Sequence, residues 1–277
     1  MEQEDIIPEE IDWEYQWKKK LENREGKLNK DWNKVAPHFK KANSKDEYLE
    51  LLLSKIILSP EDTVLDLGCG EGSITIPLSQ RVKKVTGVDS AYKMIELLMQ
   101  RIEEENINNI TTLVEKTENV TLELVGEHDV VVASRSMNGI LDLRETITNI
   151  NNIAQKYVFI TLFGPNNKKL ERSFSEYLGK PYHDFPNYDY FFNLLFSMGI
   201  YANIENLGIK THKSYNSIEE AIGTSGHGSW KIDNLTPEEL DKLHTYLEEI
   251  LVKNPETGLL ENPMDKAEWI LIWWKKE

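Results

Sequence analysis

Three glycines at alternate positions follow a short apolar run and could hold a ligand against the backbone. Gly68, Gly70 and Gly72 come directly after the aliphatic segment 63–67, and an amphipathic segment begins at Ser73. This order is typical of a strand, a tight turn and a helix. Because glycine permits positive φ angles and has no Cβ atom, a ligand can lie close to such a turn. The free N–H groups at the start of the helix point toward the same place.

The spacing of these glycines argues against a dinucleotide site. The dinucleotide fingerprint is Gly-x-Gly-x-x-Gly, with a pyrophosphate at the helix N-terminus, whereas here the third glycine comes one residue early. Asp66 lies two residues before the first glycine. A carboxylate at this point would repel a pyrophosphate, but it suits a ligand that carries an ammonium group.

A second acidic residue ends the next predicted strand. The segment 85–89 finishes at Asp89, and its separation from the turn, about 20 residues, fits the general logic of α/β nucleotide sites. A carboxylate offers acceptor oxygens to two adjacent donors, such as the two hydroxyls of a ribose. Asp89 is therefore the second candidate ligand residue.

The string Val64-Leu-Asp-Leu-Gly-Cys-Gly-Glu-Gly72 resembles motif I of the class I S-adenosylmethionine-dependent methyltransferases. The resemblance implies S-adenosylmethionine as cofactor and S-adenosylhomocysteine as product. The implied reaction moves the sulfonium methyl group to a nucleophile by in-line displacement, which needs alignment and exclusion of water more than a nucleophilic side chain.

The same resemblance assigns roles to individual residues. Asp66 would order the amino group of the cofactor, and Asp89 would accept hydrogen bonds from its ribose. Gly68, Cys69 and Gly70 would offer backbone groups to its methionine and ribose parts. The remaining predicted cofactor contacts follow the next three strands: Ser90, Met94, Thr117, Glu118, Ser134 and Arg135.

Several of these later contacts leave alternatives open. Ser90 is also the expected N-cap of the following helix, and Met94 is expected on the buried face of that helix, where it could also touch the adenine edge. Relatives commonly place an acidic residue where Thr117 stands, with Glu118 nearby, so the adenine contact is undecided. Arg135 either forms a salt bridge that fixes its loop or clamps the cofactor carboxylate or an anionic substrate.

Composition narrows the function classes. The 277 residues carry 32 Lys and Arg against 47 Asp and Glu, a formal net charge of −15, which disfavours nucleic acid as a partner. The single cysteine excludes an intrachain disulfide framework and a Cys-rich zinc site, and no other pattern indicates a metal. We expect no membrane span, since no apolar run approaches about 18 residues, and a cytoplasmic location, since the acidic N-terminus lacks a signal peptide.

Strand and helix patterns alternate from Thr63 to Phe163 and predict an α/β, doubly wound sheet. By the resemblance it has seven mostly parallel strands, with strands six and seven forming an antiparallel edge. We predict an N-terminal helical extension (1–45), a cofactor-binding Rossmann-like core (46–163) and a C-terminal half (164–277) that carries an inserted helical cap. Strand six is expected at 202–213 and strand seven at 266–276.

Two helices carry clear start signals. Ser44 with Glu47 predicts a capping box for a helix over 44–57, and Thr236 with Glu239 predicts one for a helix to about 253. In the N-terminal segment, aromatic residues either pack the extension onto the domain or form a flap over the site. Trp32, His38 and Tyr48 are the candidates to line that site.

The catalytic candidates lie in the loop after the fifth strand. Tyr182 and His183 bring proton-active groups together, and His183 could serve as a general base; it could equally be an exposed loop histidine. The proposed acceptor is a small molecule. Alternatives are a protein methyltransferase, a non-catalytic cofactor sensor, or aminopropyl transfer from the same cofactor. Neither the acceptor atom nor the oligomeric state is written in the residues.

Overall fold

The computed structural model describes residues 11–22, 31–36, 46–167, 169–182, 185–210, 212–225 and 235–276. The chain divides into two compact units. The first comprises Met1–Phe163, Phe185–Leu207 and Ile270–Glu277, and the second comprises Gly164–Asp184 and Gly208–Trp269.

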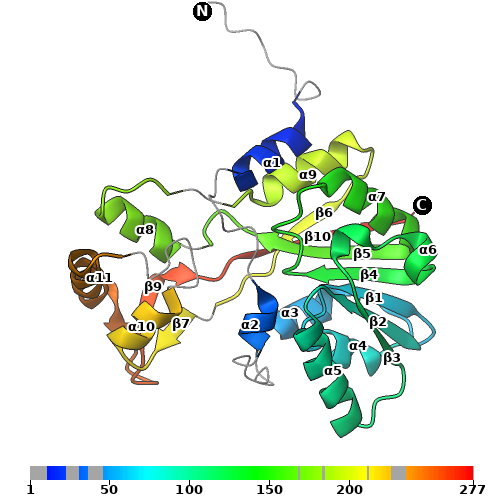
Figure 1. Cartoon of the computed structure of the whole chain (residues 1–277), viewed down its shortest axis with the longest axis horizontal. Helices are drawn as coiled ribbons and strands as arrows, with labels where there is room; N and C mark the ends of the chain where they lie inside the picture. The colour runs from blue at the N-terminus through cyan, green and yellow to red at the C-terminus, as the bar shows by residue number, and fades with distance from the viewer. Residues whose placement is uncertain are drawn as a thin grey trace, which may run out of the picture. The chain divides into compact units, whose positions relative to one another are not determined.

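A seven-stranded sheet forms the centre of the first unit, with the order β3-β2-β1-β4-β5-β10-β6 (Figure 1). Strands β1 to β5 pair in parallel, and β10 pairs with β6 in the antiparallel sense. This arrangement confirms the predicted doubly wound, mostly parallel sheet. The strands are β1 (Thr63–Leu67), β2 (Lys84–Asp89), β3 (Ile110–Val114), β4 (His128–Ser134), β5 (Ala154–Phe163), β6 (Asn203–Asn206) and β10 (Trp269–Lys275).

Helices cover both faces of this sheet, as the continuous apolar runs of β1, β4 and β5 require. In Figure 1, α3, α4 and α5 lie on one side of the sheet and α1, α7 and α9 on the other. The helical elements of the first unit are α1 (Trp13–Glu22), α2 (Trp32–Val35), α3 (Glu47–Lys55), α4 (Thr75–Ser79), α5 (Tyr92–Glu104), η3 (Thr117–Asn119), α6 (Leu122–Val125), α7 (Leu143–Ile153) and α9 (Tyr188–Ser197).

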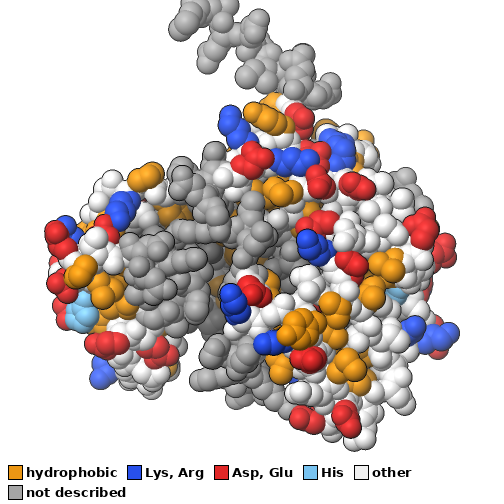
Figure 2. All heavy atoms as spheres, in the orientation of Figure 1, with side chains coloured by type: hydrophobic (Ala, Val, Ile, Leu, Met, Phe, Trp, Pro, Cys, Tyr) orange, Lys and Arg blue, Asp and Glu red, His pale blue; other side chains and the backbone are white. Residues whose placement is uncertain are grey.

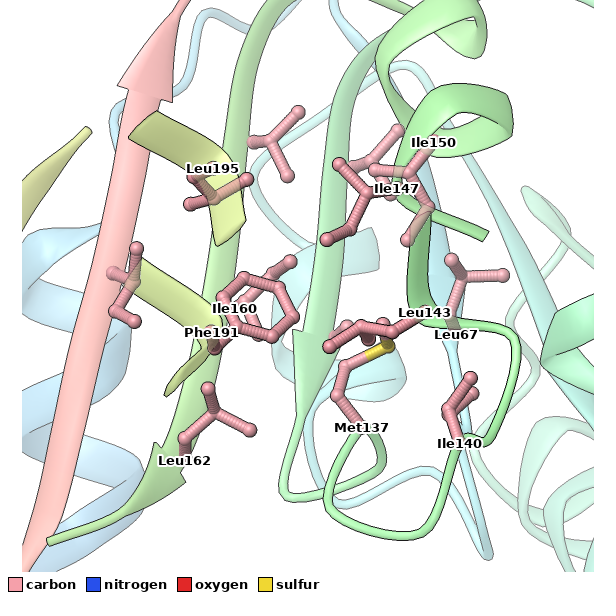
Figure 3. Close-up of a cluster of buried hydrophobic side chains, with 14 of the residues drawn as sticks. Leu67, Met137, Ile140, Leu143, Ile147, Ile150, Ile160, Leu162, Phe191 and Leu195 are labelled. Carbon is pink, nitrogen blue, oxygen red and sulfur yellow. The ribbon is translucent and has the colours of Figure 1, made fainter. Parts of the chain in front are cut away.

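The largest core cluster lies between the sheet and helices α7 and α9 (Figure 3). Helix α7 contributes Leu143, Ile147 and Ile150, whose spacing puts them on one face. Helix α9 contributes Phe191 and Leu195. Each fully buried side chain of this size stabilises the fold by about 1.5 to 3 kcal/mol before entropy is counted.

Aromatic residues of the N-terminal segment pack α1 onto the domain. Trp17 is fully buried, and its indole Nε1 donates to the carbonyl oxygen of Ile140 at 2.6 Å. Trp13 meets Tyr190 of α9 edge to face, with ring centroids 6.1 Å apart. The packing interpretation is therefore confirmed for α1.

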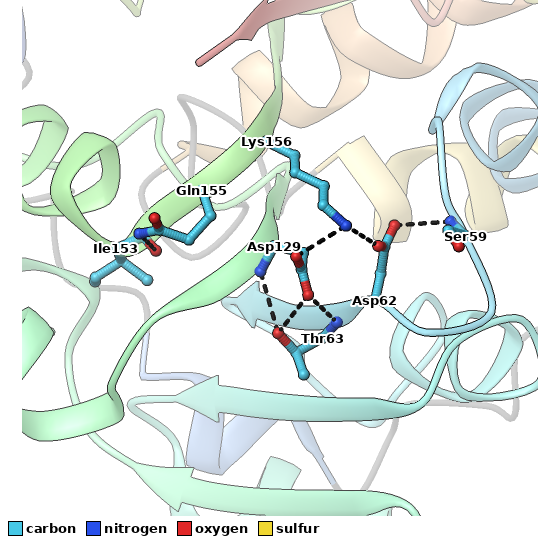
Figure 4. Close-up of polar contacts among 7 residues, drawn as sticks. All are labelled: Ser59, Asp62, Thr63, Asp129, Ile153, Gln155 and Lys156. Atoms are coloured by element: carbon cyan, nitrogen blue, oxygen red, sulfur yellow. Dashed lines mark hydrogen bonds and ion pairs between the residues drawn. The ribbon is translucent and has the colours of Figure 1, made fainter. Parts of the chain in front are cut away.

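The amino ends of β1, β4 and β5 are joined by a polar cluster (Figure 4). Lys156 Nζ lies 2.5 Å from Asp62 Oδ1 and 3.0 Å from Asp129 Oδ1. Asp62 also accepts from the N–H of Ser59 at 2.7 Å, and Asp129 from the N–H of Thr63 at 2.8 Å. These two carboxylates raise the pKa of Lys156 to about 12. The cluster ties three parallel strands together where they begin.

The second unit contains a three-stranded antiparallel sheet, β7-β9-β8, in addition to the expected helices. Its core gathers Phe174, Tyr215, Leu243 and Leu247. Its elements are α8 (Lys169–Tyr177), β7 (His212–Tyr215), α10 (Ile218–Ser225), α11 (Pro237–Ile250), β8 (Val252–Lys253) and β9 (Leu260–Lys266).

Two local predictions need correction, and one is confirmed. The expected strand over 202–213 is two strands, because Gly208 takes a φ of +67° between β6 and β7, which belong to different sheets. The N-cap of α3 is Asp46, whose carboxylate accepts from Tyr48 N at 3.0 Å; Ser44 lies outside the described residues. The capping box of Thr236 and Glu239 is present at the start of α11.

Among the helices of the described residues, none is both long enough and apolar enough to cross a membrane.

Candidate cofactor site

The glycine turn has the backbone geometry that the sequence predicts. Gly68, Gly70 and Gly72 have φ angles of +73°, +55° and +90°. The N–H groups of Gly68 and Cys69 both donate to the carbonyl oxygen of Val88, at 2.7 and 3.0 Å, so the turn is anchored to the end of β2. Glycine is therefore required here by conformation, because side chains strongly disfavour these φ values.

Space around the turn differs between its first glycine and its middle one. A Cβ atom on Gly68 would lie 2.3 Å from Ser136 Cβ, while a Cβ on Gly70 would meet nothing within 4 Å. Ser136 follows β4, and its hydroxyl donates to the carbonyl oxygen of Leu67 at 2.7 Å. The loop after β4 thus packs against Gly68 and leaves the backbone at Gly70 approachable. Ser136 is not predicted from the local sequence, since only the strand pairing brings it to the turn.

Asp66 is buried beneath the turn. It is 1% exposed, and its Oδ2 accepts from the hydroxyl of Thr75 at 2.6 Å. Burial raises the pKa of Asp66 from 3.8 to about 7; the Thr75 hydrogen bond opposes this, and the charges of Asp89 and Glu71 add to it. A positively charged ligand would reverse this cost and favour the ionised carboxylate.

Asp89 is fixed by two backbone donors. Its Oδ2 accepts from Gly70 N at 2.9 Å, and its Oδ1 from Ala91 N at 2.8 Å. Burial raises the pKa of Asp89 despite these two bonds, and the charge of Glu71 contributes. Since a carboxylate has about four lone-pair positions, each oxygen retains acceptor capacity for a ligand hydroxyl.

In the described part of the chain, no basic side chain forms an ion pair with Asp66 or Asp89. Glu71, by contrast, accepts a hydrogen bond from Ser73, and its carboxylate Oε1 lies 3.9 Å from Arg101 Nη1. The turn therefore holds one buried and one half-buried carboxylate, and none of the described residues supplies a positive partner to either.

The side chain of Cys69 points into a small apolar cluster with Ile76, Ile95 and Leu98. Burial raises the pKa of its thiol well above the ordinary value, so the thiol is neutral and inert. This leaves the backbone of Cys69 as the part available to a ligand, which is what the family resemblance implies.

The predicted adenine contacts lie around the start of α5. Ser90 is exposed, but the N-cap of this helix is Ala91, so the predicted capping role of Ser90 is wrong. Met94 is 2% exposed and packs against Ala36 and Ala91. Asn33 Oδ1 of α2 accepts from the N–H of Lys93 at 3.1 Å, which attaches the N-terminal segment to this helix.

The segment that follows β3 carries the remaining adenine candidates. Thr117 and Glu118 are both half-buried, in η3. Glu115 N donates to the carbonyl oxygen of Asp89 at 3.1 Å, which holds the β3 end beside the β2 end. The Glu115 carboxylate accepts from Asn119 Nδ2 at 2.7 Å. Thr117 and Glu118 therefore share this edge of the sheet with Asp89.

A second polar group occupies the ends of β4 and β5. The phenol oxygen of Tyr48, from α3, lies 2.7 Å from both Ser134 Oγ and Thr161 Oγ1. Burial raises the pKa of Tyr48, so the phenol is protonated at neutral pH. Arg135 is exposed, and its guanidinium Cζ lies 4.1 Å from the centroid of the Tyr48 ring. Tyr48 therefore lies at the ends of β4 and β5, in contact with Ser134, Thr161 and Arg135.

Neither of the two predicted catalytic residues is among the described residues of the first unit. Tyr182 belongs to the second unit, where Arg172 Cζ lies 5.9 Å from the centroid of its ring. His183 lies outside the described residues, as does His38. No group of three His, Cys, Asp or Glu side chains that could hold a metal ion occurs among the described residues.

Comparison with known proteins finds similarity to methyltransferases. Residues 64–156 match the family described as "Methyltransferase domain". An uncharacterized protein of Haemophilus influenzae is 27% identical over 231 residues, covering 82% of this chain and 81% of that protein. A probable cobalt-precorrin-6B C(15)-methyltransferase (decarboxylating) of Methanobrevibacter smithii is 31% identical over 104 residues; the match covers 38% of this chain and 56% of that enzyme.

The fold is also found among solved structures. A putative methyltransferase from Bacillus halodurans superposes with a TM-score of 0.57 and 16% identity, covering 83% of this chain and 99% of that one. The fold and the glycine turn define a Rossmann-like α/β domain. The family match shows a methyltransferase domain at residues 64–156, and this domain contains the glycine turn that resembles motif I of the class I S-adenosylmethionine-dependent methyltransferases.

Proposed function

We propose that this methyltransferase transfers the methyl group of S-adenosylmethionine to a small-molecule acceptor by in-line displacement. The observation that carries the proposal is a pair of carboxylates, the buried Asp66 and the half-buried Asp89, beside an approachable glycine backbone. When bound, the cofactor supplies an electrophilic methyl group on a sulfonium. The acidic surroundings suit a ligand that bears an ammonium and a sulfonium charge.

The residues present fit this cofactor. Asp66 would order its ammonium group through a hydrogen bond or a bridging water, and that positive charge would offset the cost of ionising a buried carboxylate. Asp89 is held by two N–H groups with acceptor capacity to spare for the ribose hydroxyls. Gly70, where an added Cβ would meet nothing, leaves backbone groups accessible to the same ligand.

The protein residues need not form a covalent bond with the acceptor. Alignment of the acceptor and exclusion of water can supply several kcal/mol of barrier lowering, of the order measured for well-oriented reactants. An acceptor that must lose a proton would need a base, and His183, with Tyr182 beside it, is our candidate for that role. The Tyr48 phenol is not available as a base near neutral pH, because burial raises its pKa and keeps it protonated.

Charge supports a small molecule over a nucleic acid. The net charge is −15, and on the face drawn in Figure 2 the Lys and Arg side chains of the described residues are interspersed with Asp and Glu. A phosphate backbone would need a continuous basic surface. That the protein takes no nucleic acid partner and resides in the cytoplasm remain predictions from the sequence.

Calorimetric titration with S-adenosylmethionine and S-adenosylhomocysteine tests the cofactor residues. We expect Asp89→Ala to weaken both by tenfold or more, about 1.4 kcal/mol, as loss of hydrogen bonds to a charged group predicts. Asp241→Ala, at an exposed position of α11, is the matched control and should bind as wild type does. Unchanged affinity of the Asp89 variant would contradict its assignment.

The acceptor class is tested by transfer of a labelled methyl group. The full chain is incubated with labelled cofactor and, in parallel, with a metabolite extract below 1 kDa, total RNA, or denatured protein. We expect label in the first fraction only. Label in RNA or protein would overturn the small-molecule proposal while leaving the methyltransferase assignment intact.

A further inference from the structure

Arg135 has an unusual backbone for a residue with a side chain. Its φ is +58°, in the left-handed region, which costs an L-residue about 1 to 2 kcal/mol. Its N–H donates to the hydroxyl of Thr161 at 2.9 Å. A strained conformation of this kind persists only where the surroundings hold it, and such residues cluster at functional sites.

Two buried side chains hold Arg135 in this conformation. Thr161 is 1% exposed and Tyr48 is 3% exposed. Thr161 pairs with Ser134 across β4 and β5, and the Tyr48 phenol bridges the hydroxyls of both, at 2.7 Å each. Three hydroxyls from α3, β4 and β5 therefore converge beneath a single exposed residue.

The guanidinium is also supported from below. With its Cζ 4.1 Å from the ring centroid, it lies over the face of Tyr48, within the range of a cation–π contact. A stacked guanidinium loses less side-chain entropy when it binds, and its planar donors match a carboxylate or phosphate in two parallel hydrogen bonds. The Tyr48 ring beneath the guanidinium is fixed by its two hydrogen bonds, and Arg135 is an exposed residue.

Strand order separates this cation from the carboxylates of the cofactor site. Asp89 ends β2 and Asp66 lies in β1, whereas Ser134 and Thr161 lie in β4 and β5, on the other side of β1. The β1–β2 side of the sheet edge is suited to the cationic parts of a ligand. The β4–β5 side carries the opposite charge and is left for the methyl acceptor.

We propose that Arg135 binds an anionic group of the acceptor, and hence that the acceptor is a small carboxylate or phosphate compound. The inference rests on the proposed methyl transfer and adds the chemical class of its substrate. Tyr48 and Thr161 act as positioning residues, because they touch Arg135 and fix its backbone rather than contact the acceptor's anion.

The test uses benzoate and inorganic phosphate as anions and benzamide as the neutral match for benzoate. Each is titrated into the full chain, with and without saturating S-adenosylhomocysteine, at constant ionic strength. The Arg135 Nε–H resonance, assigned by its loss in Arg135→Lys, is followed by NMR. We expect saturable shifts with either anion in the millimolar range, none with benzamide, and at least fivefold weaker binding of both anions in Thr161→Val.

Two results would overturn the proposal. The first is an absence of saturable anion binding, or equal binding of benzoate and benzamide. The second is that Arg135→Met weakens S-adenosylhomocysteine tenfold yet leaves its decarboxylated analogue, S-adenosyl-3-thiopropylamine, unaffected. That result would assign Arg135 to the cofactor carboxylate. The result that we expect is different. Arg135→Met should bind S-adenosylhomocysteine and its decarboxylated analogue within twofold of wild type, and it should bind neither benzoate nor phosphate.

Failure of the proposed function gives a different pattern. A wild-type protein that binds no S-adenosylhomocysteine, but still binds benzoate through Arg135, would retain the anion site and lose the cofactor assignment. Tyr48→Phe provides a second positioning variant in case Thr161→Val folds poorly. It removes only the phenol oxygen and keeps the ring under the guanidinium, so weaker anion binding in it would report the loss of the hydroxyl bridge.

Discussion

Strand β1 carries a buried aspartate at each end, and the two side chains have opposite surroundings. Asp62, just before the strand, is 2% exposed and paired with Lys156 at 2.5 Å. Asp66, within it, is 1% exposed, and among the described residues its carboxylate is hydrogen-bonded to the Thr75 hydroxyl alone. One carboxylate is neutralised by its own chain, while the other has no positive partner among the described residues.

The neighbours of these residues follow the same division. We call the edge of the sheet where β1, β4 and β5 begin the amino edge, and the edge where the parallel strands end the carboxyl edge. At the amino edge, partial burial of Asp129 would raise its pKa, but hydrogen bonds from Thr63 and Lys156 lower this pKa on balance. At the carboxyl edge, burial raises the pKa of Asp89 and outweighs two backbone hydrogen bonds. At the first edge the carboxylates are paired with Lys156, whereas at the second none of the described residues supplies a cation, which is the difference that our proposed cationic ligand requires.

The largest expected effect is a pH dependence confined to the carboxyl edge. The pKa of Asp66 is about 7 in the fold against an ordinary 3.8, so the folded state binds the proton more tightly. The apo-protein should therefore lose stability as pH rises from about 4 to about 7, by up to about 4 kcal/mol, and change little above that.

Denaturant unfolding of wild type and Asp66→Asn across this window measures the effect as the difference between the two curves. Asp66→Asn should lack this component of the slope. Parallel curves for the two proteins would show that Asp66 is ionised in the apo-fold, and the contrast between the two edges would disappear.

The next effect is on the amino edge. Asp62→Ala leaves the Ser59 N–H without its acceptor and Lys156 with one carboxylate instead of two, and we expect a loss of about 2 kcal/mol of unfolding free energy. Affinity for S-adenosylhomocysteine should stay within twofold of wild type. A stable Asp62 variant with impaired cofactor binding would reverse the roles assigned to the two edges.

A third prediction concerns the backbone of the turn. Gly68→Ala combines a φ of +73° with a Cβ placed 2.3 Å from Ser136 Cβ, and the left-handed strain alone should cost about 1 to 2 kcal/mol. Thermal unfolding of Gly68→Ala and of Gly68→Ala with Ser136→Gly separates the two causes. The double variant should recover the steric part only; full recovery would mean that the φ angle carries no penalty.

The smallest predicted change is in affinity. Asp66→Asn should weaken S-adenosylmethionine by about tenfold, or 1.4 kcal/mol, by removing the charge that faces a cationic ligand. Asp62→Asn is the matched substitution at the amino edge and should leave the affinity unaltered. Equal affinities for both variants, measured by calorimetry at pH 8, would remove Asp66 from the cofactor site.

Local signals predicted the cofactor side of the sheet well. The positions of Gly68, Asp66 and Asp89 follow from a strand, a turn and a second strand, each of which can be predicted from a few neighbouring residues. The capping box at Thr236 can be predicted for the same reason. Their functional roles remain predictions.

The features that the sequence did not reveal depend on distant pairing. Ser136 meets Gly68, and Tyr48 meets Thr161, only because β1, β4 and β5 lie side by side. Strand β9 was missed for a different reason: it contains Asn262, Pro263 and Asp265, types that disfavour strands. Its partners β7 and β8 are only four and two residues long, too short for a periodic signal.

The position of β10 has a consequence for how the chain is made. This strand lies between β5 and β6, although it is synthesised after both and after the whole segment 208–268. Until β10 leaves the ribosome, β5 therefore presents an unpaired apolar edge, a template for wrong pairing between chains. Translation that stops short of Trp269 would release a polypeptide with an intact glycine turn and an open sheet, a natural client for chaperones and proteases.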